Sequence, residues 1–532
     1  MTDIAHRVSI WVRTRLLRLR SAQDALGPNR EHFDKRDAES FIAAQLPTGE
    51  EVGLRCIWVC EAYLAGQVSQ LAESLRGLGL DTPFTIPELT TASVLKARAG
   101  SGLIWHDLGY LLPASVAANR SQALPGRPAC LPPGVESVFL TVTTTLPSAT
   151  ILVAQFRFDD KTARDIEIPF RTQYRTTEVR DKEFRRILSD ENLRDRAVQD
   201  HRSQLRERCQ GWLANNVPGA FIALGGEPPP TSELITFAIG DPLVGLHTDT
   251  PASNRLKDTA DSSVVENRSP RTRSNWNSYM AILGQQDEWL AWRCPEIPGL
   301  SFRFQREAWV DPLNDFSVLS ARVADFAPAF KRGDDSVRTA LGVTQGLYYL
   351  HHTIGILALA QLARRYEIKV ARLRDELGGV RLDQPSQAIS SLTRIDRELA
   401  TVAQDARPFL NDVVGAADDV WHHPDVYTFV PLRKDDGDLR LFPWLMRDLK
   451  ERSQRVLRLD AIVSETCERM SNHVAASVNL RLTRVNIGLQ WLMVVLTVVA
   501  VILAGLAPPG ALHSLLGLFL AATLTVPRFS SP

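Results

Sequence analysis

The sequence predicts an α+β cytosolic domain followed by a helical hairpin, a long stalk helix and a C-terminal two-helix transmembrane hairpin. Three observations predict this fold class. Short β-rich runs alternate with amphipathic helical patterns in the first part of the chain, a nearly uninterrupted helical pattern runs from Trp444 to Ala507, and two apolar runs lie near the C-terminus. At 532 residues, with 44% hydrophobic and 23% charged side chains, the chain is long enough for two or three domains and has the composition of a largely soluble protein.

Charge and cysteine usage exclude some function classes. The 61 basic and 61 acidic side chains cancel, so there is no electrostatic reason to expect nucleic acid as a partner. The six cysteines show neither a CxxC motif nor a Cys/His zinc spacing, which favours reduced thiols over disulfides. Arginine outnumbers lysine, which we attribute to a GC-rich, bacterial-type genome.

Residues 1–30 form a basic amphipathic N-terminal segment. Ile4, Val8 and Leu16 share one helical face, and arginines occupy much of the rest. Such a helix can lie on an anionic membrane surface, or it can pack as a surface helix on the domain that follows. Its arginines interrupt the apolar residues too often for a secretory signal.

Residues 31–248 and 277–343 are predicted to form the α/β domain, interrupted by a polar flexible loop or linker at 249–276. Apolar residues spaced by three or four predict helices at 53–79 and 178–213. Runs of β-branched and aromatic residues bounded by turn residues predict strands at 136–142, 150–158, 166–170, 219–224, 233–240 and 300–310.

No catalytic signature occurs in this domain. A glycine-rich phosphate loop, GxSxG and HExxH are all missing from the sequence, so we expect no enzyme and no cofactor, and no metal ligand can be named. Cys56 and Cys60 lie one turn apart on the predicted helix 53–79, where packing is the expected role. Three histidine motifs lack a partner or the geometry to form a catalytic or metal site: His106–Asp107, His351–His352 and His422–His423.

Residues 344–443 are predicted to form a helical hairpin and a connector. The first helix keeps its apolar spacing from Leu347 to Leu377 and ends at Gly378–Gly379. The second begins at Pro385 and is expected to end at Arg407–Pro408, because proline breaks a helix.

From residue 444 the pattern predicts one helix about 95 Å long at 1.5 Å per residue. Its first part, the stalk helix 444–486, is amphipathic, and its last part, transmembrane helix 1 at 487–507, is uncharged and long enough to cross about 30 Å of hydrocarbon. Transmembrane helix 2 at 511–526 is shorter, and it either spans or re-enters the bilayer. Arginines flank the hairpin, so we expect a multi-pass protein of the inner (plasma) membrane with both termini in the cytoplasm. Two buried core helices are the alternative.

Four residues of transmembrane helix 1 share one face and are candidate pore-lining residues: Asn486, Gln490, Thr497 and Ala504. Either they line the axis of an oligomer, or Asn486 and Gln490 lie at the headgroup level and Thr497 bonds its own helix backbone. The membrane hairpin tip consists of Pro508, Pro509 and Gly510. We interpret the tip as a turn, and a pore mouth lined by backbone carbonyls is the alternative.

Residues 445–526 resemble the CorA family of magnesium channels. ILAGLAPPG (502–510) falls where that family has an apolar-Ala-Gly run before its Gly-Met-Asn motif, and Pro508, Pro509 and Gly510 stand in place of that motif. The resemblance implies a homo-oligomer, namely a pentamer, in a lipid bilayer, with a divalent cation as its ion, but without the family's filter. Two function classes stay open: an oligomeric ion channel with a non-standard or lost selectivity filter, and a membrane-tethered sensor, effector or scaffold whose cytosolic domain binds a partner or signal.

Overall fold

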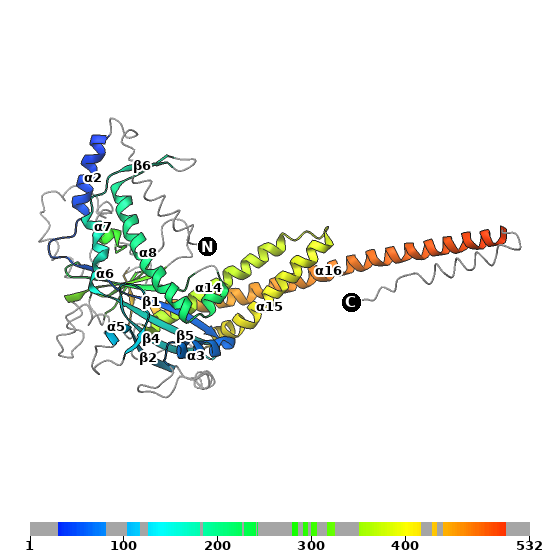
Figure 1. The fold of residues 1–532 in the computed structure, drawn as a ribbon, viewed down its shortest axis with the longest axis horizontal. Helices are drawn as coiled ribbons and strands as arrows, with labels where there is room; N and C mark the ends of the chain where they lie inside the picture. The colour runs from blue at the N-terminus through cyan, green and yellow to red at the C-terminus, as the bar shows by residue number, and fades with distance from the viewer. Residues whose placement is uncertain are drawn as a thin grey trace. The chain divides into compact units, whose positions relative to one another are not determined.

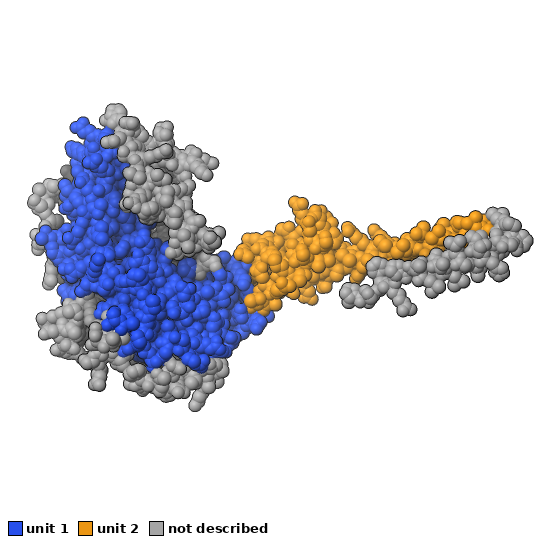
Figure 2. Space-filling view, in the orientation of Figure 1, with its two compact units in different colours: residues 1–369, 402–458 blue, residues 370–401, 459–532 orange. Residues whose placement is uncertain are grey.

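The fold is described from a computed structural model of the chain. It describes residues 30–80, 104–117, 126–180, 185–225, 228–240, 242, 279–285, 291–295, 299–305, 316–324, 351–416, 428–432 and 440–506. The chain divides into two compact units, which Figure 2 shows in blue and orange. Unit 1 comprises residues 1–369 and 402–458, and unit 2 comprises residues 370–401 and 459–532. The polar loop 249–276, the hairpin tip, transmembrane helix 2 and most of the N-terminal segment lie outside the described residues.

Unit 1 is built on a ten-stranded mixed sheet with the order β12-β9-β10-β11-β8-β1-β5-β4-β2-β3 (Figure 1). Neighbours are antiparallel except for the parallel pairs β8–β11 and β2–β3. The strands are β1 (Val52–Leu64), β2 (Ile104–Pro113), β3 (Gly126–Ala129), β4 (Val135–Leu146), β5 (Ala149–Phe158), β8 (Thr231–Phe237), β9 (Ala291–Arg293), β10 (Ser301–Gln305), β11 (Phe316–Arg322) and β12 (Val430–Pro431). A separate hairpin pairs β6 (Thr177–Arg180) with β7 (Arg185–Leu188).

Helices cover both faces of this sheet. On one face Leu205 and Trp212 of α8 (Asp190–Asn216) join Val59 of β1 in the main hydrophobic core. The next residue, Cys60, points to the opposite face, where its thiol lies 4.0 Å from the carbonyl oxygen of Ile354 in α14 (His351–Gly378). The sheet is therefore a buried central layer between helices.

Shorter helices complete unit 1. They are α2 (Arg30–Ala44), η2 (Ala65–Gln67), α3 (Val68–Gly77), α5 (Ala114–Ala117), α6 (Asp160–Arg164), η3 (Asp165–Glu167), α7 (Ile168–Arg171), α9 (Ala220–Leu224) and α11 (Tyr279–Ile282).

The long helices follow the sheet in sequence. The helices α14, α15 (Pro385–Gly415) and α16 (Leu441–Leu506) each contribute residues to both units. In unit 1 Trp444 of α16 packs against Trp292 of β9, with ring centroids 5.4 Å apart. In unit 2 Arg394 of α15 pairs with Glu376 of α14 at 2.5 Å. An α+β domain followed by helices, the coarse form of the predicted fold class, is thus confirmed.

Several predicted elements match the structure. The strands at 136–142 and 150–158 are the β4–β5 hairpin, and the strand predicted at 233–240 overlaps β8, which ends at Phe237. The first long helix ends at Gly378, as its glycine pair predicts. The long helical pattern from Trp444 is the single helix α16, whose 66 residues span about 99 Å at 1.5 Å per residue.

The helix predicted over 53–79 is wrong in its first half. Residues 52–64 form β1, which is buried along its whole length and pairs with β8 over residues 52–59 and with β5 over residues 56–64. A strand buried on both faces is apolar on both, so it lacks the alternation that marks a half-buried strand, and its spacing also fits a helix. The second half does form α3, with Val68, Leu71 and Leu75 buried.

Three further predictions are corrected. Residues 166–170 form η3 and α7 instead of a strand, with Ile166 and Phe170 buried one turn apart. Residues 219–224 form α9 instead of a strand. The predicted helix 178–213 begins as the β6–β7 hairpin, and α8 starts only after Ser189, whose side chain accepts the amide of Asn192 at 3.3 Å.

The helix α15 also continues past its predicted end. Pro408 lies inside the helix, which ends at Gly415. Phe409, Leu410 and Val413 are buried, so packing beyond the proline outweighs the backbone hydrogen bond that Pro408 cannot donate.

Candidate functional sites

The last part of α16 is exposed on all sides. From Leu480 to Leu503 its large apolar side chains are each between 45% and 68% exposed. A helix that is apolar all round is stable inside a protein core or a membrane, and an exposed patch of this kind is not stable in water. Within the described part of the chain, α16 is the helix that is long and apolar enough to cross a membrane. By length and composition it is a candidate membrane span.

The candidate pore-lining residues lie on this span. Asn486, Gln490 and Thr497 are exposed, and Ala504 belongs to the last turns of the helix. The hydroxyl of Thr497 donates to the carbonyl oxygen of Met493 at 2.8 Å. Because this hydroxyl is satisfied by its own helix, it needs no water-filled path as a partner. The pore-lining role of the set stays a prediction, and Pro508, Pro509 and Gly510 lie outside the described residues.

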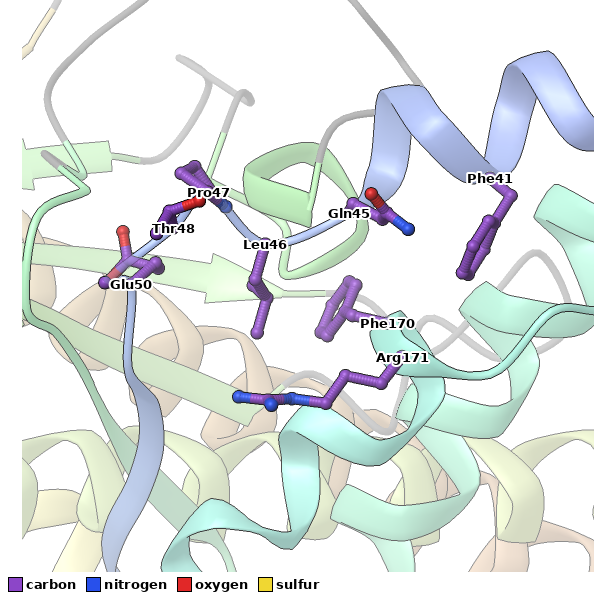
Figure 3. Close-up of a pocket in the computed structure, with 9 residues that line it drawn as sticks. Phe41, Gln45, Leu46, Pro47, Thr48, Glu50, Phe170 and Arg171 are labelled. Carbon is purple, nitrogen blue, oxygen red and sulfur yellow. The ribbon is translucent and has the colours of Figure 1, made fainter.

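A cleft of about 310 Å³ opens in unit 1 beside α2 and α7 (Figure 3). Figure 3 shows Leu46 and Phe170 as neighbouring side chains, with Arg171 extending beneath them. The lining comes from two segments that are distant in sequence, namely residues within 41–50 and the pair Phe170 and Arg171. Apolar rings, an amide, a hydroxyl and a guanidinium thus meet in one cleft.

Both carboxylates beside the cleft have structural partners. Glu50 accepts the amides of Ala238 at 2.8 Å and Gly240 at 2.6 Å, and also the hydroxyl of Tyr279 at 2.8 Å. Glu167 accepts the amide of Val52 at 2.9 Å, and its other oxygen accepts Arg171 at 2.6 Å. Carboxylates held in this way fix β1 and its surroundings instead of serving as a free base.

The thiols of Cys56 and Cys60 are buried, and the three histidine motifs form no metal site among the described residues. Burial raises the pKa of the Cys56 thiol to about 12 and raises the pKa of Cys60 still further, so both thiols stay protonated. Their packing role is as expected, although they lie on strand β1 and not on a helix. His106 lies on β2, His351 and His352 begin α14, and His422–His423 lie outside the described residues. No group of three His, Cys, Asp or Glu side chains in the described part could hold a metal ion.

A buried charge cluster, which the sequence analysis did not single out, joins α8 to the sheet. Glu233 of β8 is fully buried, and its carboxylate oxygens accept hydrogen bonds from the guanidinium groups of Arg202 at 2.7 Å and Arg206 at 2.5 Å, both from α8. Both guanidinium groups also lie over the ring of Phe316. Burial raises the pKa of Glu233, but the two arginines lower it by more, so the pKa lies below its ordinary value. The only sequence signal for this cluster is a glutamate inside a strand that is otherwise uncharged.

No model of a known protein family matches this sequence, and no curated protein matches it either. The fold and the exposed helix define a broader class. The protein has a mixed-sheet domain followed by long helices, the last of which is apolar enough to cross a membrane.

Proposed function

We propose that the protein is an integral membrane protein of CorA-like architecture, in which an oligomer forms an ion channel with a non-standard selectivity filter. The observation that carries this proposal is the continuity of α16. The same helix contributes to the core of unit 1 through Leu445 and Leu449 and ends in the exposed apolar stretch from Leu480 to Leu503. A helix without a break transmits displacement along its axis better than a jointed one.

Two further features support the architecture. A sheet covered by helices is followed in sequence by the helices α14 and α15 and then by α16, which is the element order of the family that the C-terminal part resembles. A single membrane helix encloses no path for an ion, so conduction requires several copies around an axis. The face that carries Asn486, Gln490 and Thr497 is the one we assign to that axis.

A membrane-tethered sensor or effector is the second candidate, and the Thr497 hydrogen bond favours it. A hydroxyl bonded to its own helix needs no water or polar neighbour, so it suits a helix that faces lipid. In this candidate the sheet domain binds a partner or signal, and the cleft beside Arg171 is the site we assign to it.

Ion flux into liposomes decides between the two. Purified protein reconstituted around a magnesium-sensitive dye should admit divalent cations if it is a channel. Gln490→Leu and Thr497→Val, on the assigned face, should then reduce flux or change its selectivity, whereas Val495→Leu on the opposite face should leave both unchanged. Flux no greater than in protein-free liposomes would end the channel proposal and leave the tethered sensor.

A further inference from the structure

Glu61 lies at the point where β1 loses one of its neighbouring strands. The pairing of β1 with β8 extends from Val52 only to Val59, and β1 itself continues to Leu64. Cys60, Ala62 and Leu64 alternate along β1, so their amides point toward the edge that β8 has left. Each of these donors still has an acceptor: the carbonyl of Pro230 at 3.2 Å, the Glu61 carboxylate at 3.0 Å and the Gln67 amide oxygen at 3.1 Å, respectively.

The Glu61 carboxylate also holds the helix that fills this space. Oε1 of Glu61 accepts a hydrogen bond from the amide of Phe221 in the first turn of α9 at 2.7 Å, and the Gly219 amide also stabilises the ionised carboxylate. Gly219 permits this approach, because a Cβ there would lie 2.5 Å from the Ala62 carbonyl oxygen and 2.6 Å from Cγ of Glu61. One oxygen atom therefore fastens α9 to β1.

The other oxygen of Glu61 is left alone. The side chain is completely buried, and within the described part of the chain Oε2 has no hydrogen-bond partner. An ionised Glu61 would place part of its negative charge on Oε2, which has neither water nor a donor, and this costs free energy. A proton on Oε2 removes the charge, and Oε1 can still accept hydrogen bonds from the backbone amides.

Beyond α9, the contacts continue to the long helices within unit 1. The guanidinium of Arg365 in α14 lies 4.5 Å from the ring centre of Phe221 and donates to the carbonyls of Phe221 and Pro228. Two residues later, Glu367 accepts Arg455 of α16 at 3.0 Å. The segment that Glu61 fastens is thus one of the supports of α14.

We propose that Glu61 is a proton-dependent latch, which holds α9 against β1 when it is protonated and loosens α9, with its contact to Arg365, when the proton is lost. Loosening lets water reach Oε2. The proposal goes beyond the proposed function and holds whether or not α16 conducts ions.

The charges around Glu61 are compatible with such a latch. Burial raises the pKa of Glu61 to about 7, although the backbone amides and Arg365 stabilise the ionised form. The titratable neighbours on β1 are Cys60 and Tyr63, α9 carries no charged side chain, and the residue opposite on β5 is Leu152. Titration therefore falls in the range of cellular pH.

Hydrogen–deuterium exchange of the purified full chain tests the latch. Exchange in peptides covering 217–228 is compared at pH 6 and pH 8 after correction for intrinsic exchange, with α3 peptides as the internal reference. Since the open segment has an ordinary glutamate pKa of 4.5 and the closed one about 7, linkage predicts about a tenfold loss of protection between these pH values. Glu61→Gln should remove the pH dependence, and Glu73→Gln, an exposed glutamate of α3, should behave as wild type.

Equal protection of the wild-type segment at both pH values would overturn the proposal, and so would an unchanged pH dependence in Glu61→Gln. Gly219→Ala provides an independent test if the Glu61→Gln protein fails to fold. Its methyl group should lower protection of α9 at both pH values and shrink their difference, because water then reaches Glu61. A Gly219→Ala protein with wild-type protection and wild-type pH dependence would also refute the latch.

Discussion

The buried cluster of Glu233 with Arg202 and Arg206 makes the stability of unit 1 depend on one carboxylate. Glu233→Gln keeps the shape of the side chain but removes the charge that two arginines share. Glu233 and Arg202 have no exposed side-chain surface and Arg206 has 5%, so water cannot replace the lost partner.

The size of the effect follows from this burial. Removing one partner of a buried ion pair typically costs about 3–5 kcal/mol, because the remaining charge stays uncompensated. For a domain of a few hundred residues, this corresponds to a fall in Tm of roughly 6–20 °C. Arg202→Met in the Glu233→Gln background should recover part of the loss, since it removes one of the two unpaired cations.

The pH dependence provides a second readout. The pKa of Glu233 lies below its ordinary value of 4.5, so its contribution is complete above that pH and is lost as pH falls through the lower, folded value. The Glu233→Gln protein should therefore be less stable than the wild type at pH 7, and its stability should fall less than that of the wild type as the pH is lowered below 4.5. Glu61 has the opposite sign, because its raised pKa makes stability fall as pH increases from about 4.5 to about 7.

Thermal unfolding in detergent, followed by tryptophan fluorescence, measures both effects on the full chain. The matched control is Glu465→Gln, since Glu465 pairs with Arg469 on the exposed surface of α16, with 61% and 76% of the two side chains exposed. Exposed pairs contribute little, so the control should melt with the wild type. A Glu233→Gln protein that also melts within about 2 °C of wild type would refute the reasoning, because a buried ion pair cannot be lost at so small a cost.

Two further predictions concern α16. Val474 is 1% exposed within unit 2, so Val474→Asp should bury an unpaired charge and destabilise this unit by a few kcal/mol. Ile462→Asp, at a 58% exposed position, should not destabilise it. Thermal melts followed by circular dichroism compare the two variants, and equal melting temperatures would contradict the assigned packing. Leu496→Arg places a charge near the middle of the apolar stretch at a cost of about 2.5–3.5 kcal/mol, so the protein should become extractable by carbonate, unlike Leu480→Arg at its start. Carbonate-resistant Leu496→Arg protein would argue against a span at these residues.

Part of this architecture is determined by the sequence alone. The length of α16, its apolar end, the β4–β5 hairpin and the end of α14 at Gly378 all follow from local patterns. The reason is that helix periodicity, strand composition and glycine stops act over a few residues, so the information lies within the segment itself. The common face of Asn486, Gln490 and Thr497 is local in the same way.

Only the tertiary structure decided the rest. β1 is a strand because β5 and β8 pair with it from 85 to 185 positions away along the chain, and no pattern within residues 52–64 distinguishes that environment from a helix. The cleft combines α2 and α7, Glu233 meets arginines of α8, and Glu61 accepts an amide 160 positions away. Burial, the partners of buried charges and the shift of their pKa values arise only when distant segments pack together, since each depends on what excludes water from the group.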